Sequence, residues 1–198
     1  MRPSDEELVE SFQCGDYSAF DQLLERWQRK IHGAIYRIMG SEDETRDLSQ
    51  ETFLRAYRAL GSFKKEARFS SWLYQIALNQ CRDRLRRRKL RAAVSLEELA
   101  ENGDAAQVRE PGPSAFDLVE RGELSRKVAA AVQALPEEQR EVIVLKEYQG
   151  LTFLEIAEAL GVPPSTVKTR LYRGLGQLRL QLEREGIRGT AALPAALS

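Results

Sequence analysis

Five side chains near the C-terminus have the types and spacing needed to recognise the edges of base pairs. They recur at intervals of three and four residues, so that on a helix they would share one side. Short hydroxyl groups and longer cations suit the major groove of DNA, where each base pair presents its own pattern of donors and acceptors. The residues are Ser165, Lys168, Thr169, Tyr172 and Arg173. This pattern predicts contact with double-stranded DNA.

The elements that must position these groups are two short helices within residues 155–174, EIAEALGVPPSTVKTRLYRG. Apolar residues keep a helical spacing on both sides of the sequence Gly-Val-Pro-Pro. Gly161 suits the left-handed residue that ends a helix, and the prolines suit entry into the next one. Val167 and Leu171 are expected to face the core. The segment therefore predicts a helix-turn-helix.

A second set of candidate DNA contacts lies upstream, in the loop GSFKKEARFSSW and the helix WLYQIALNQCRDRLRRRKL that follows it. The loop alternates aromatic rings with cations, which is typical of contacts to unpaired nucleic acid. One strip of the helix combines groups for stacking, base edges and phosphates. Phe69 is expected to enter the core instead. The predicted contacts are Phe63, Lys64, Lys65, Trp72, Asn79, Arg82 and Arg86.

A third candidate surface lies on the helix predicted for SEDETRDLSQETFLRAYRAL, residues 41–60. Its apolar side includes Leu48, Ala56 and Tyr57, which indicates that this side faces a core. A solvated surface explains most charges on the other side, but it does not require the leucine at the centre of them. That second side consists of Asp47, Gln50, Glu51, Leu54 and Arg55.

The fold is predicted to be all-α, with two small helical domains joined by a flexible acidic linker and a helix-turn-helix in the second domain. Residues from Tyr17 to Ile38 keep the apolar spacing of a core helix, and no convincing strand alternation occurs. A Gly-, Pro- and acid-rich stretch interrupts the helical pattern. The expected boundaries are 1–91 for the first domain, 92–123 for the linker, 124–186 for the second domain and 187–198 for a tail.

Charge is segregated along the chain, although its formal net charge is zero. Residues 52–91 carry twelve Lys and Arg against two acids, a net charge of +10, whereas residues 92–123 carry eight acids against two Arg, a net charge of −6. Basic surfaces on a neutral chain indicate localised contact with a polyanion.

Other function classes receive little support from the sequence. No apolar run of about 18 residues and no secretory signal occurs. We therefore expect no membrane insertion, and we expect a cytoplasmic location. Cys14 and Cys81 are far apart and predict two reduced thiols, with a disulfide or redox role as the alternative. No zinc, phosphate-loop or nucleophile motif occurs, and the lone His32 favours a structural role. We therefore expect no metal, cofactor, small-molecule substrate or catalytic residue.

Together the three motifs resemble those of a bacterial RNA polymerase sigma factor, in the extracytoplasmic-function (ECF) group of the sigma-70 family. RDLSQETFLRAYRAL is similar to the helix that docks on the polymerase, and SFKKEARFSSWLYQIALNQCRDRLRRR to the segment that melts and reads the −10 element. LPEEQREVIVLKEYQGLTFLEIAEALGVPPSTVKTRLYRGLGQLR resembles the domain that reads the −35 element. The resemblance covers roughly residues 5–185.

The resemblance implies a protein that performs no chemistry itself and has three kinds of partner. The face centred on Leu54 would dock on the clamp coiled coil of the largest subunit of core RNA polymerase. Phe63 and Asn79 would hold an extruded base of the −10 element, and the face around Arg173 would contact the −35 element of promoter DNA. An anti-sigma factor would hold the chain inactive. Gly174 departs from the family pattern, which more often has Ala there, and Gly174 and Gly176 are expected to weaken their helix by about 1 kcal/mol each.

Two alternatives remain open at this point. A stand-alone helix-turn-helix regulator would usually bind as a dimer to a palindromic site, and it would not need the second basic region. A nuclease or other nucleic-acid-processing enzyme would need a cluster of metal-binding carboxylates or a general base, and the sequence shows neither.

Overall fold

The computed structural model describes residues 2–64, 68–102 and 123–187, and within these ranges every regular element is a helix. The prediction of an all-α fold is confirmed. In chain order the elements are α1 (Asp5–Gln13), α2 (Ser18–Met39), α3 (Glu42–Leu60), α4 (Phe69–Asn102), α5 (Glu123–Gln133), α6 (Glu137–Ile143), the π-helix η1 (Val144–Tyr148), α7 (Phe153–Leu160) and α8 (Pro164–Arg184).

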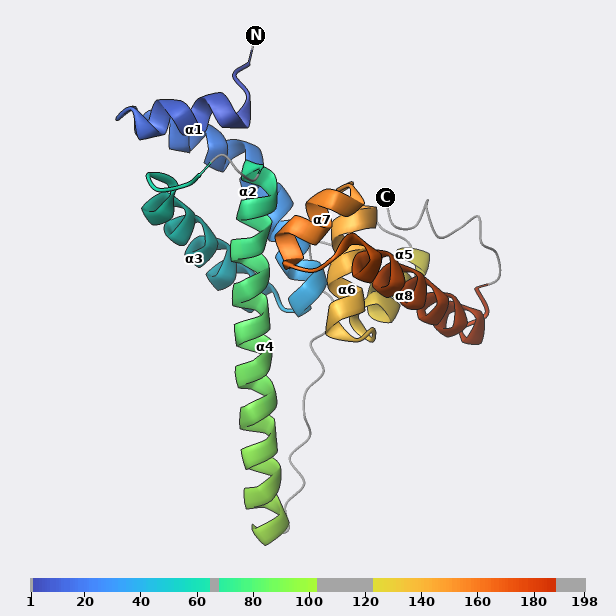
Figure 1. Ribbon diagram of the computed structural model, residues 1–198. Coiled ribbons are helices and arrows are strands. Elements are labelled where there is room, and N and C mark those ends of the chain that lie inside the picture. The colour runs from blue at the N-terminus through green and yellow to red at the C-terminus, as the bar shows by residue number, and fades with distance from the viewer. Residues whose placement is uncertain (1, 65–67, 103–122, 188–198) are drawn as a thin grey trace.

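Helices α1 to α4 form the N-terminal group, and α2 supplies the centre of its core (Figure 1). Trp27 is 6% exposed and Ile31 and Ile35 are fully buried, as their spacing predicts. Phe69 is also buried, which confirms its predicted place in the core. The prediction is wrong for Tyr17, which is 64% exposed because it precedes α2 and lays its ring edge-on against Phe12 instead.

The predicted apolar side of α3 is also only partly correct. Leu48 and Ala56 are buried, but Tyr57 is 44% exposed. Its ring packs edge-on against Phe12 and Phe20, with centroid distances of 5.4 and 5.1 Å. Tyr57 therefore lies at the rim of the core, where a large ring can be in contact on one side and in solvent on the other.

Helix α4 is longer than the sequence predicts. It continues through Asn102, so residues 92–102, which we expected in the acidic linker, are helical and extend away from the rest of the protein (Figure 1). Ala92 and Ala93 favour helix and no Gly or Pro interrupts residues 92–102, which explains why the helix does not stop after the basic run. The remaining linker residues, 103–122, lie outside the described residues.

The C-terminal group contains α5 to α8, with α7 and α8 forming the predicted helix-turn-helix. A capping box starts α7, in which Thr152 and Glu155 exchange hydrogen bonds, and Gly161 ends it at φ 66°. Val167 and Leu171 of α8 are buried as predicted. Helix α6 ends at Ile143, and the chain continues as the wider turns of η1.

Gly174 allows α8 to approach α6 closely. A Cβ atom added there would lie 2.8 Å from Ile143 Cδ1 and 3.2 Å from Gln139 Cβ, whereas one added at Gly176 would meet nothing within 4 Å. Ile143 is itself fully buried, so its methyl group would have to shift within the core to admit that Cβ atom. The glycine that departs from the family pattern is thus required by packing in this chain.

Gly174→Ala is therefore expected to destabilise the protein, and Gly176→Ala to stabilise it. Overpacking of a core costs about 1–3 kcal/mol, which outweighs the roughly 1 kcal/mol that Ala gains over Gly in a helix. At the exposed Gly176 only the helix term applies. Chemical denaturation of both variants measures the two changes, and equal stabilisation by both would show that α6 does not restrict Gly174.

The two helical groups pack against each other. Helix α7 contacts α4, and α2 contacts α5, α6 and η1 (Figure 1). Arg37 of α2 stacks on the Tyr148 ring of η1, with its guanidinium carbon 4.3 Å from the ring centroid. Residues far apart in the sequence thus form one contact surface between the groups.

Candidate nucleic-acid interface

Helix α8 presents the predicted major-groove residues on its outer side. All five side chains are exposed, Tyr172 by 67%, while Val167 on the opposite side is fully buried. Thr169 Oγ1 donates a hydrogen bond to the Ser165 carbonyl oxygen, 3.0 Å away, which fixes its hydroxyl against the helix. The outward face consists of Ser165, Lys168, Thr169, Tyr172 and Arg173, and we call it the α8 face.

The start of α4 and the loop before it bring three aromatic rings together. Phe63 packs on Trp72 with a centroid distance of 4.8 Å, and both rings are half-buried. Phe69 supports them from the core, 6.4 Å from Phe63 and 5.8 Å from Trp72. The edges of Phe63 and Trp72 that remain accessible could stack on a base.

The other predicted single-strand contacts differ in their accessibility. Lys64 and Asn79 are exposed, whereas Lys65 lies outside the described residues. Arg86 is exposed and forms a surface ion pair with Asp83, with a nitrogen–oxygen distance of 2.9 Å. Arg82 is half-buried and is engaged by the C-terminal group.

Arg82 forms a bidentate ion pair with Glu141 of α6, a contact that the sequence does not predict. Its Nε and Nη2 atoms lie 2.7 and 2.6 Å from the two carboxylate oxygens. Glu141 is 1% exposed, and burial raises the pKa of its carboxyl group, while the hydrogen bonds from Arg82 oppose that shift. The hydrogen bond to Glu141 in turn raises the pKa of Arg82. The sequence carries one signal, because Glu141 directly precedes the apolar run 142–145, and this indicates a buried carboxylate but not its partner.

The polar face of α3 is largely accessible and has an apolar centre. Leu54 is 43% exposed. Beside it, Arg55 Nε lies 2.7 Å from Glu51 Oε1, four residues earlier on the helix. Protein–protein interfaces commonly have apolar residues at their centre and a polar rim, so this face suits a protein partner better than DNA. It comprises Asp47, Gln50, Glu51, Leu54 and Arg55, and we call it the α3 face.

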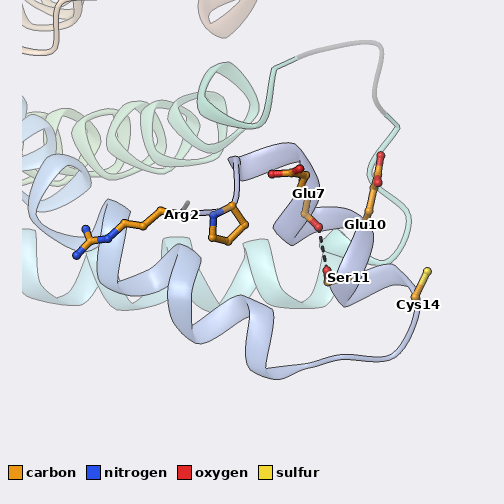
Figure 2. Close-up of a pocket in the computed structure, with 6 residues that line it drawn as sticks. Arg2, Glu7, Glu10, Ser11 and Cys14 are labelled. Atoms are coloured by element: carbon orange, nitrogen blue, oxygen red, sulfur yellow. Dashed lines mark hydrogen bonds between the residues drawn. The ribbon is translucent and has the colours of Figure 1, made fainter.

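Other features of the described residues offer no alternative site. A pocket beside α1 is lined by Arg2, Pro3, Glu7, Glu10, Ser11 and Cys14 (Figure 2). Glu7 there forms a capping box with Ser4, so part of this lining already stabilises the start of α1. Cys14 is exposed, Cys81 is buried, and both thiols are free.

Neither a metal cluster nor a membrane-spanning helix is found in the part of the chain that the structure describes. No three His, Cys, Asp or Glu side chains there come together in an arrangement that could hold a metal ion. No helix in those ranges is long and apolar enough to cross a membrane.

Comparison with known proteins identifies the family. The family model for sigma-70 region 2 matches residues 23–91, and that for sigma-70 region 4 matches residues 125–178. The chain is 39% identical to the RNA polymerase sigma-H factor of Pseudomonas aeruginosa over 173 residues, which is 85% of this chain and 89% of that protein. It is 37% identical to the ECF RNA polymerase sigma factor SigW of Bacillus subtilis over 176 residues, 88% of this chain and 94% of that protein.

The fold is similar to that of solved sigma factors. The structure of CnrH in complex with the cytosolic domain of CnrY matches with a TM-score of 0.68 and 28% identity, over 91% of this chain and 97% of that one. The sigma factor RpoE of Bartonella quintana, solved with the anti-sigma factor NepR, has the same fold, with a TM-score of 0.65 and 22% identity over 83% of this chain and 96% of that one.

These matches define the class as a promoter-recognition subunit of bacterial RNA polymerase. The chain belongs to the sigma-70 family, in the ECF group. It binds core RNA polymerase and directs initiation at promoters. The stand-alone regulator does not account for the match to region 2, and the family is one of transcription initiation factors, not of enzymes.

Proposed function

We propose that three faces of this ECF sigma factor divide the work of initiation. The α3 face docks on the clamp coiled coil of the largest polymerase subunit. The residues around Phe63, Trp72 and Asn79 hold unpaired −10 DNA, and the α8 face reads the −35 element. The observation that carries the proposal is the α8 face itself, since a helix-turn-helix presents five exposed polar or cationic groups opposite a fully buried Val167.

The domain boundaries follow from the same assignment. The first domain, 1–91, would dock on polymerase and open the −10 region, and the second, 124–186, would bind the −35 element. The basic segment 52–91, with a net charge of +10, supports a DNA path along the first domain. Since RNA polymerase acts in the cytoplasm, we assign the chain to that compartment.

An anti-sigma factor is the partner that we propose for regulation. CnrH and the Bartonella quintana RpoE were each solved with a partner protein, the cytosolic domain of CnrY and the anti-sigma factor NepR respectively. This chain shares its fold with both. Accessible apolar side chains such as Leu54 and Leu154, which is 72% exposed, would suit coverage by such a protein.

Asn79→Ala is expected to impair promoter opening while leaving −35 binding intact. Asn79 is exposed on α4, where its amide could bond to the edge of an extruded base. Extrusion itself costs a few kcal/mol, so losing the bonds that hold the base should reduce the open complex. Permanganate reactivity of the −10 region measures opening, and a −35 duplex measures binding by the second domain.

Gln28→Ala is the matched control, because Gln28 is another exposed amide residue of the N-terminal group but lies on α2. It should leave permanganate reactivity at the wild-type level. A template with a pre-melted bubble should restore Asn79→Ala only if the side chain assists opening. Unchanged reactivity in Asn79→Ala would contradict the −10 assignment.

A further inference from the structure

The contact between the two helical groups includes charged side chains of the basic segment 52–91, among them the predicted −10 contact Arg82. Three cations of the N-terminal group each face a carboxylate of the C-terminal group. Besides the bidentate pair of Arg82 with Glu141, Arg68 Nη1 lies 2.6 Å from Glu155 Oε1, and Lys89 Nζ lies 3.2 Å from Glu137 Oε2. We call these three ion pairs the closing pairs.

All three cations lie within residues 52–91, the segment with a net charge of +10. They extend from the end of the loop before α4, at Arg68, along α4 to Lys89. A DNA strand following this helix would place its phosphates near the same groups, because phosphate contacts come mainly from Arg and Lys. A carboxylate that accepts from a guanidinium through both oxygens, as Glu141 does from Arg82, uses the same bidentate geometry as a phosphate.

The contact between the two helical groups also includes hydrogen bonds to backbone carbonyl groups at the end of α2. The last carbonyl groups of a helix lack partners within that helix. In α2, the Arg37 carbonyl oxygen accepts from Gln133 Nε2, and the Ile38 carbonyl oxygen accepts from Arg140 Nη1 at 2.6 Å. Arg140 Nη2 simultaneously donates to the Leu135 carbonyl oxygen, 2.9 Å away, so one guanidinium joins the two groups.

A side-chain hydrogen bond and close packing against a glycine add to the contact between the two helical groups. Tyr74 Oη donates to Gln149 Oε1 at 2.8 Å. Gly40, in the left-handed conformation after α2, leaves room for Gln133, whose Oε1 would lie 2.9 Å from an added Cβ. The bidentate pair of Arg82 with the buried Glu141 and the fit of Gln133 against Gly40 favour one closed arrangement of the domains. The pairs of Arg68 and Lys89 lie at the exposed edge of this contact, where each ion pair is weaker.

We propose that Glu137, Glu141 and Glu155 act as intramolecular substitutes for DNA phosphates. In the free chain they hold Lys89, Arg82 and Arg68, so that the C-terminal domain covers part of the single-strand path while the α8 face stays exposed. Separation of the domains, driven by core polymerase and promoter DNA, releases the three cations for the −10 strand. The inference rests on the proposed −10 path along α4.

The test compares two triple variants of the full-length chain with equal changes in charge. Glu137→Gln, Glu141→Gln and Glu155→Gln together neutralise the closing pairs, and Gln at 155 still permits the capping box of α7. The control replaces Glu138, Glu147 and Glu158 by Gln. These are exposed residues of the same domain, of which Glu138 pairs within it, to Arg170 at 2.9 Å. Both variants raise the net charge by three, so unspecific attraction to DNA increases equally.

We expect the closing-pair variant to show a larger radius of gyration in small-angle X-ray scattering and about tenfold tighter binding of a labelled −10 single strand than the control. Far-ultraviolet circular dichroism should show wild-type helicity in both. If Glu141→Gln prevents folding, the double variant Glu137→Gln, Glu155→Gln leaves the buried pair intact and should give part of the gain. Equal scattering and equal affinity for the two triple variants would overturn the proposal.

Promoter opening by the wild-type holoenzyme separates this inference from the proposed function. If the holoenzyme melts promoters but the closing-pair variant binds the single strand no better than the control, the masking is disproved and the proposed function stands. If the holoenzyme fails to melt promoters, the proposed −10 role is wrong, and the proposed masking of the −10 path is then wrong as well.

Discussion

Leu54→Asp is expected to weaken binding to core RNA polymerase by several kcal/mol while leaving thermal unfolding unchanged. Leu54 is 43% exposed at the centre of the α3 face, with the Arg55–Glu51 pair beside it. Docking would bury the new carboxylate without a partner, which is costly. A surface substitution outside the core, by contrast, rarely changes stability by more than about 0.5 kcal/mol. A titration with labelled core polymerase, beside a thermal melt, measures both effects.

Leu180→Asp provides the matched control, because Leu180 is also an exposed leucine, 57% accessible, but lies on α8 outside the α3 face. It should bind core polymerase nearly as well as the wild type. Equal losses in the two variants would point to a general effect of charge, and unchanged binding of Leu54→Asp would place the docking surface elsewhere.

Arg173→Ala is expected to lower −35 affinity by about 1–3 kcal/mol and to relax the preference at one base pair. Arg173 is exposed on the α8 face, and the helix beneath it is anchored by the buried Val167 and Leu171. A guanidinium that bonds to a base edge loses affinity most for the correct base. Binding of the variant to every single-base substitution of a −35 site therefore distinguishes base contact from phosphate contact.

Arg184→Ala is a suitable comparison, since Arg184 is exposed on the same helix but lies at its other end. It should retain the base preference of the wild type. If Arg173→Ala weakened all −35 variants equally and reduced the salt dependence of binding, Arg173 would contact phosphate and the base-reading assignment would be wrong.

Local patterns in the sequence were sufficient to predict most of the fold. The periodic apolar residues of α2 and Gly161 at the end of α7 each depend on interactions within a few residues of the chain. The same holds for the inward positions of Val167 and Leu171, which leave the α8 face outside. Such features are encoded where they occur, so periodicity and turn residues reveal them.

Features that depend on distant segments could not be predicted in this way. Tyr17 and Tyr57 keep a helical spacing with core residues, yet both end at the rim because Phe12 of α1 packs beside them. From the sequence, Gly174 is expected to destabilise α8, and only the position of Ile143 on α6 explains why a glycine is present there. The pairing of Arg82 with Glu141 joins residues 59 positions apart, so neither residue alone indicates it.

In vitro transcription with purified core polymerase tests the central assignment most directly. Core enzyme alone and core enzyme with the full-length chain would be compared on a library of promoter fragments, and the 5′ ends of the transcripts sequenced. We expect that adding the chain produces discrete start sites, whose upstream sequences share one −35 and one −10 element. Transcripts that are unchanged in amount and position from those of core enzyme alone would contradict it.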